Sequence, residues 1–153
     1  MKLDAFDKKI LQYLQEDNRI AQRDLAEKVN LSASAINRRI ATMEKEGVIK
    51  GSVAVVDAAK IGRPITVIAE VALANERLDL LREAKRCFSE CPQVQQVYYV
   101  TGEFDFLLIF VVRDMAEYEA LTQELFFASD NLKHFRTLVA MQQVKQGLSV
   151  LAD

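Results

Sequence analysis

The sequence lacks the residue groups on which most small metalloproteins and enzymes depend. Its single histidine, His134, and its two cysteines, Cys87 and Cys91, leave no second pair of ligands for a zinc ion. The five glycines are isolated and form no phosphate-binding loop, and no nucleophile is paired with a histidine. We therefore expect no metal, no cofactor and no catalytic residue, and we interpret the cysteines as buried thiols.

Long hydrophobic runs are also missing. No stretch approaches the roughly 18 apolar residues of a membrane span, and the opening MKLDAFDKK lacks the apolar segment of a signal peptide. We expect a cytoplasmic protein without a membrane partner. With 153 residues, half of them hydrophobic, the chain can form one or two small cores, and two small domains fit best.

Net charge is small but unevenly distributed. Residues 1–50 hold ten Lys and Arg against eight Asp and Glu, whereas residues 51–153 hold ten against fourteen. The basic excess therefore lies in the first third of the chain. Because the excess is modest, tight binding to a polyanion would need two or more copies of this part acting together.

The stretch Gln22–Gly47 predicts two short helices joined by a tight turn. Asn30 tolerates the left-handed conformation of a helix exit, and Ser32 can cap the next helix. Apolar residues recur at helical spacing on one face of each helix and predict the inward stripes: Leu25, Ala26 and Val29 in the first, Ile36, Ile40 and Met43 in the second.

The other face of the second helix carries small, amide and basic side chains, with no acid before Glu44: Ser34, Asn37, Arg38, Ala41 and Lys45. Such a face suits the DNA major groove, because it is thin, offers bidentate donors and attracts phosphate. The alternative is a solvated helical face, since short helix-turn-helix patterns also occur in enzymes and interaction modules. The flanking sequence must decide between the two.

Before this stretch, an apolar stripe from Leu3 to Leu14, with Asp4 as N-cap, predicts another helix and completes a three-helix unit over residues 1–50. Residues 51–63 are rich in β-branched side chains and predict an extended linking strand and connector. A single strand cannot satisfy its own backbone groups, so this one is expected to pair with the same strand of a second chain.

Residues 64–153 predict a second domain with the order strand, helix, strand, strand, helix, strand. This is a split βαβ, ferredoxin-like βαββαβ arrangement, which makes the whole chain an α+β protein. The expected ranges, in order, are Ile65–Leu73, Leu78–Glu90, Val94–Thr101, Phe104–Val112, Met115–Phe127 and Thr137–Lys145.

Both faces of the third strand of this domain are apolar. Phe104, Phe106, Leu108, Phe110 and Val112 are expected to point one way, and Leu107, Ile109 and Val111 the other. Each helix has one apolar stripe, so the two helices can cover one sheet face only. An uncovered apolar sheet is unfavourable on a monomer, so we infer that the second face packs against another chain.

Together, the three-helix (winged-helix-like) unit, the linking strand and the ferredoxin-like domain resemble the Lrp/AsnC family of bacterial and archaeal transcription regulators. The resemblance covers essentially the whole length. The segments that carry it are LDAFDKKILQYLQEDNRI, DLAEKVNLS, RRIATMEKEGVIKG, VTGEFDFLL, RDMAEYEAL and MQQVKQ. Two positions depart from the common pattern: Ala21 stands where many members have serine, and Asn30 where they have glycine.

The resemblance implies a ligand-responsive regulator that binds double-stranded DNA and forms dimers assembling into tetramers, octamers or larger rings. It implies a small effector, usually an amino acid, near Thr101, Gly102, Glu103, Phe104 and Asp105, with help from the Asp114 region. The loop chemistry agrees, because backbone N–H groups at a glycine can bind a carboxylate and an acid can pair with an ammonium group. A hairpin turn with surface acids is the alternative.

DNA contacts are expected from Ser32, Ser34, Asn37, Arg38 and Arg39, of which Arg39 matches the family's recurrent basic position. Two other functions stay open. The chain could be an effector-sensing subunit that acts through mixed assembly with related regulators. It could also be a small enzyme that uses Glu103, Asp105 and Asp114 as acid-base groups, although no motif supports that chemistry.

Overall fold

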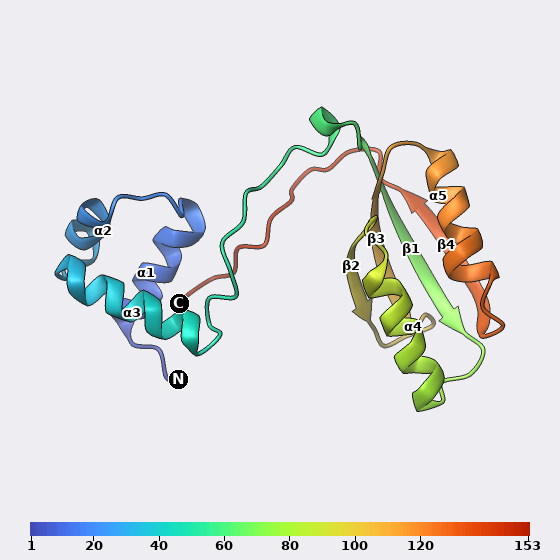
Figure 1. Cartoon of the computed structure of the whole chain (residues 1–153), viewed down its shortest axis with the longest axis horizontal. Helices are drawn as coiled ribbons and strands as arrows, with labels where there is room; N and C mark the ends of the chain where they lie inside the picture. Colours follow the sequence, from blue (N-terminus) through green and yellow to red (C-terminus); the bar gives the residue numbers. More distant parts are fainter. The chain divides into compact units, whose positions relative to one another are not determined.

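The computed structural model describes residues 1–153 and contains two compact units. The first comprises Met1–Val55 together with Lys145–Asp153, and the second comprises Val56–Val144 (Figure 1). Residues 145–153, which the sequence groups with the second domain, therefore lie in the first unit. No helix has the length and apolar character needed to cross a membrane.

Three helices form the first unit: α1 (Ala5–Glu16), α2 (Gln22–Val29) and α3 (Ala33–Lys45). The predicted inward stripes are confirmed, since the buried core consists of Ile10, Leu25, Val29, Ile36 and Met43. Ala26 and Ile40 pack against this core and are half-buried.

The predicted helix ends are confirmed in detail. Asp4 caps α1 in a reciprocal capping box with Asp7, and Ser32 caps α3 by accepting a hydrogen bond from the backbone N–H of Ala35 at 3.2 Å. Asn30 has φ 64°, in the left-handed region. Ala21 stands at the N-cap of α2 without a side-chain hydrogen bond, so this helix start is weaker than the other two.

The connector after α3 is not a paired strand in the single chain. Residues 51–57 form no regular element, and a 3₁₀ turn follows at Ala59–Ile61. Val53 and Val55 are 83% and 97% exposed. The predicted pairing of this segment needs a second chain and stays a prediction.

Four antiparallel strands form the sheet of the second unit, in the order β2-β3-β1-β4. This order, with both helices packed on one face, is the predicted ferredoxin-like arrangement. The elements are β1 (Ile65–Leu73), α4 (Leu78–Glu90), β2 (Val94–Tyr99), β3 (Phe106–Val112), α5 (Met115–Thr122), a π-helical turn (Gln123–Phe127) and β4 (Leu132–Val139).

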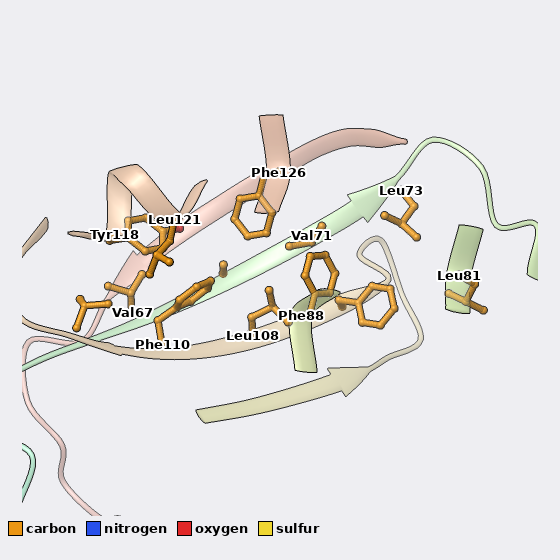
Figure 2. Close-up of a cluster of buried hydrophobic side chains, with 13 residues drawn as sticks. Val67, Val71, Leu73, Leu81, Phe88, Leu108, Phe110, Tyr118, Leu121 and Phe126 are labelled. Atoms are coloured by element: carbon orange, nitrogen blue, oxygen red, sulfur yellow. The ribbon is translucent and has the colours of Figure 1, made fainter. Parts of the chain in front are cut away.

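The core of this unit lies between the helices and one face of the sheet (Figure 2). Phe88 of α4 meets Phe106 and Phe126 edge to face, with ring centroids 5.3 and 5.9 Å apart. Tyr118 of α5 packs on Phe110, and its hydroxyl is hydrogen-bonded to the hydroxyl of Thr137 at 2.6 Å. Both cysteines are free thiols. They are half-buried, whereas the sequence predicted buried thiols.

Burial alternates strictly along β3, which confirms that its two faces differ. Phe106, Leu108, Phe110 and Val112 are buried under the helices, whereas the alternate residues on the face opposite to the helices are half-buried: Leu107, Ile109 and Val111. That second face has no cover from its own chain.

Two strand predictions are wrong. The last strand is Leu132–Val139 rather than Thr137–Lys145, because its register is fixed by pairing with β1, where Glu70 opposes Arg136. Phe104 does not continue the buried row of Phe106. β3 begins only at Phe106, and the ring of Phe104 packs beside His134 and Arg136, at 5.5 and 5.2 Å, on the uncovered side.

Candidate DNA-reading and effector sites

The outward face of α3 is available for a partner. Ser32, Ser34, Asn37 and Arg38 are all exposed, and they occupy the N-terminal two turns of the helix. The hydroxyls of Ser32 and Ser34 lie 3.1 Å apart. Because helix N-termini carry a partial positive charge, this end of α3 favours an anionic partner even before Arg38 is counted.

Arg39 differs from its neighbours, because its guanidinium is already paired. Its Nη1 lies 2.7 Å from Oδ1 of Asp7 and 2.8 Å from Oδ2 of Asp4, and the group sits 5.5 Å from the ring centre of Phe6. The Arg39 side chain is 27% exposed and that of Asp7 only 4%. The backbone N–H of Asp7, and then Arg39, lower the pKa of Asp4. Arg39 therefore fastens α3 to the start of α1.

The loop from Thr101 to Asp105 joins β2 to β3. Gly102 has φ 114°, a conformation that side chains rarely adopt, and it is exposed with Thr101 and Glu103. The N–H of Val100 donates to the carbonyl oxygen of Asp105 at 2.8 Å and closes the loop at its base.

Asp105 has a structural role in this loop. One carboxylate oxygen accepts a hydrogen bond from the N–H of Leu73 at 2.7 Å, and the N–H of Asp105 donates to the carbonyl of Val71 at 2.9 Å. Asp105 thus fixes the loop to the end of β1. The other carboxylate oxygen of Asp105 does not accept the hydrogen bond from Leu73.

Glu76 also belongs to this site, and no sequence pattern predicts it. A hydrogen bond with the Asp105 carboxyl, and then the negative charge of Asp105, raise the pKa of Glu76. Glu76 lies in the loop between β1 and α4, and only the fold brings it to Asp105. The two carboxyls form an acidic pair beside an exposed glycine.

Phe104 connects the loop to the uncovered face of the sheet. Arg136, beside its ring, also forms an ion pair with Glu70 at 2.5 Å, across the β1–β4 register. The same Glu70 oxygen is buried and has no aligned hydrogen-bond donor, so the pair is held by charge and not by a linear hydrogen bond. Charged and aromatic groups thus meet at one end of an otherwise apolar face.

Asp114 does not join the loop within one chain. It is the N-cap of α5 and accepts a hydrogen bond from the N–H of Glu117 at 2.8 Å. It lies beyond the end of β3 that is opposite to the loop, and a strand of this length separates them by about 20 Å. Asp114 of one copy can contribute to the loop site only from a different copy.

Comparisons with known proteins find a matching family for each of the two units. The winged helix-turn-helix DNA-binding family matches residues 3–50, and the Lrp/AsnC ligand binding domain matches residues 66–150. The chain belongs to the Lrp/AsnC family. Members of this family are transcription regulators, and this chain accordingly has a DNA-binding unit and a domain that binds a small-molecule effector.

Individual relatives of this Lrp/AsnC protein align over nearly its full length. An uncharacterized HTH-type transcriptional regulator from Sinorhizobium fredii is 39% identical over 150 residues, which are 98% of this chain and 89% of the relative. A leucine-responsive regulatory protein from Haemophilus influenzae is 36% identical over 144 residues, 94% of this chain and 87% of the relative.

Solved structures support the same fold. The crystal structure of an AsnC family regulator from Agrobacterium tumefaciens has a TM-score of 0.90 at 36% identity, and the alignment covers 97% of this chain and 96% of the other. A transcriptional regulator from Neisseria meningitidis, in complex with L-Met, has a TM-score of 0.90 at 24% identity with the same coverage.

Proposed function

We propose that this regulator binds DNA as a dimer or a larger assembly of dimers, reads the major groove with α3, and responds to an α-amino acid held near the loop 101–105. The observation that carries the proposal is the exposed N-terminal face of α3. On this face neither Asn37 nor Arg38 is paired with an acidic side chain. Asn37 suits a base edge, and Arg38 suits a guanine or a phosphate.

Dimerisation rests on the uncovered sheet face. Ile68 pairs with Ile109 of β3 and with Leu138 of β4, so the three form one row across the side opposite to the helices, and Leu138 is 42% exposed. A second copy packed face to face would remove this apolar surface from water. Such a dimer places two copies of α3 on one DNA and offsets the weak positive charge of each DNA-binding unit.

The effector proposal rests on the chemistry around Gly102. Backbone N–H groups of the exposed loop can hold the carboxylate of an amino acid, and Asp105 with Glu76 can hold its ammonium group. The raised pKa of Glu76 fits this role, because it reflects the repulsion between two nearby carboxylates, which an incoming cation would relieve. The L-Met complex of the Neisseria protein is a precedent for an amino acid on this fold.

To test the proposed DNA binding, the affinity for the DNA upstream of the regulator's own gene is measured at two salt concentrations. Affinity should fall steeply with salt, and Asn37→Ala should lose roughly 1–3 kcal/mol on the specific site only. Arg38→Ala should weaken binding, and Arg82→Ala, which changes an exposed arginine of α4, is its matched control and should not. Absence of DNA binding that is restored by a related regulator would instead support the mixed-assembly function.

The effector arm is tested by a thermal-shift screen of the twenty amino acids. A ligand that binds only the folded state raises the melting temperature by mass action. The shift should disappear in Asp105→Asn and in Glu76→Gln, compared with the unchanged response of Glu119→Gln on α5. Lack of any shift with all twenty would contradict an amino-acid effector.

A further inference from the structure

Helix α1 holds a distant segment of the chain on its outer face. The side-chain amide of Gln15 pairs with both backbone groups of Val150: Nε2 donates to the carbonyl oxygen at 2.9 Å, and Oε1 accepts from the N–H at 2.8 Å. Two turns earlier in the helix, Lys8 Nζ donates to the main-chain oxygen of Asp153. The first unit therefore includes residues from both ends of the sequence.

The spacing of these contacts matches on the two segments. Lys8 and Gln15 are seven residues apart and share one helix face, with a rise between them of about 10 Å. Three residues of extended chain, from Val150 to Asp153, also span about 10 Å. The later residue of the helix meets the earlier residue of the tail, so the tail runs antiparallel to α1.

We propose that Lys145–Asp153 is a clasp that occupies the Lys8–Gln15 face of α1 in its own chain. The clasp gives the DNA-binding unit a second covalent connection to the second unit, after the connector that follows α3. The contact needs neither DNA nor an effector.

Hydrogen bonds, and not apolar burial, hold the clasp. Leu148, Val150 and Leu151 are between 72% and 90% exposed, and only Ala152 of the segment is half-buried. A segment held by a few solvent-accessible hydrogen bonds opens and closes readily, whereas one anchored in a core does not. The clasp is therefore a reversible contact.

Hydrogen exchange in the full-length protein tests the contact. In Gln15→Ala the amide of Val150 loses its acceptor, and its exchange rate should rise about tenfold, whereas the amides of β1 stay unchanged. Gln22→Ala makes the same chemical change at an exposed position of α2 and should leave Val150 as it is. Equal exchange of Val150 in wild type and Gln15→Ala would overturn the proposal.

Cross-linking tests that the contact lies within one chain. With Cys87→Ser and Cys91→Ser in place, Gln15→Cys with Val150→Cys is treated with a short bis-maleimide and analysed by denaturing mass spectrometry. We expect a cross-linked single chain, in higher yield than for Gln22→Cys with Val150→Cys. Cross-linked pairs of chains, or two thiols modified but not joined, would refute a clasp within one chain.

Discussion

Two adjacent arginines of α3 have opposite surroundings. One helical step turns Arg38 toward solvent and Arg39 toward α1, where Asp4 and Asp7 enclose its guanidinium. The interpretation of Arg39 as a DNA contact came from its position in the sequence. Its partners lie 32 and 35 residues away, so no local pattern could have identified them. We propose that Arg39 positions the recognition helix and leaves phosphate binding to Arg38.

Arg39→Gln separates the two roles. Loss of the cation leaves the carboxylate of Asp7 almost buried without its partner, and the free energy of unfolding should fall by about 2 kcal/mol. The slope of log affinity against log salt should stay unchanged, because no phosphate contact is lost.

Arg38→Gln is the matched control. Its stability should not change, and its salt slope should decrease by about one. If Arg39→Gln lowered the salt slope and left stability intact, Arg39 would be a phosphate contact after all.

Ala21 is a second position where one side chain decides a local property. Its backbone has the extended conformation of an N-cap, with φ −61° and ψ 138°, but its methyl group cannot accept a hydrogen bond. Ala21→Ser should supply this acceptor to the start of α2 and raise the free energy of unfolding by about 1 kcal/mol, as measured by urea denaturation. Ala21→Val gives no side-chain acceptor and should not stabilise.

At the scale of elements, Glu117 joins the start of α5 to three other segments. Arg63 donates to both of its oxygens, at 3.2 and 3.3 Å, Gln93 donates to Oε1, and the N–H of Arg113 donates to Oε2 at 2.7 Å. Its side chain is only 8% exposed. The N–H of Arg113, followed by Gln93 and Arg63, lowers the pKa of Glu117 from 4.5 to about 2.

This depressed pKa makes part of the stability depend on pH. The contribution of Glu117 is complete above its unfolded pKa of 4.5 and is lost as the pH falls from there toward about 2. We estimate about 2 kcal/mol after allowance for solvent screening. In urea titrations between pH 6 and pH 3, the stability difference between wild type and Glu117→Gln should therefore shrink as the pH falls, without vanishing by pH 3. Parallel curves would contradict this assignment.

Elements defined by local patterns were predictable, and those defined by distant partners were not. Ile65–Leu73 and Leu78–Glu90 have the predicted bounds because period-two and helical spacing are present in their own residues. Leu132–Val139 was misplaced because its bounds depend on pairing with β1. The same reason explains why residues 101–105 can be assigned to one loop from the sequence, whereas the contact of Glu76 with Asp105 cannot be predicted from it. Within one chain Asp114 lies at the other end of β3, and its place in the effector site stays a prediction.

For the whole molecule, the uncovered sheet face should decide the assembly state. Ile109→Asp places a charge at its centre, which a face-to-face interface cannot solvate. Sedimentation should show monomers, whereas Ala116→Asp, on the exposed side of α5, should keep the wild-type mass. A circular dichroism melt confirms that both variants are folded. Unchanged assembly in Ile109→Asp would exclude this face as the interface.

The clasp also bears on how the protein is made. Some 90 residues, from Val56 to Val144, are synthesised between the two parts of the first unit. At ordinary rates of translation this interval lasts roughly 5 to 20 s. During that time the three helices can fold on the ribosome, but α1 has no clasp. The DNA-binding unit is thus the first to begin folding and the last to be completed, so a newborn chain cannot have its finished form until the whole sheet has also been made.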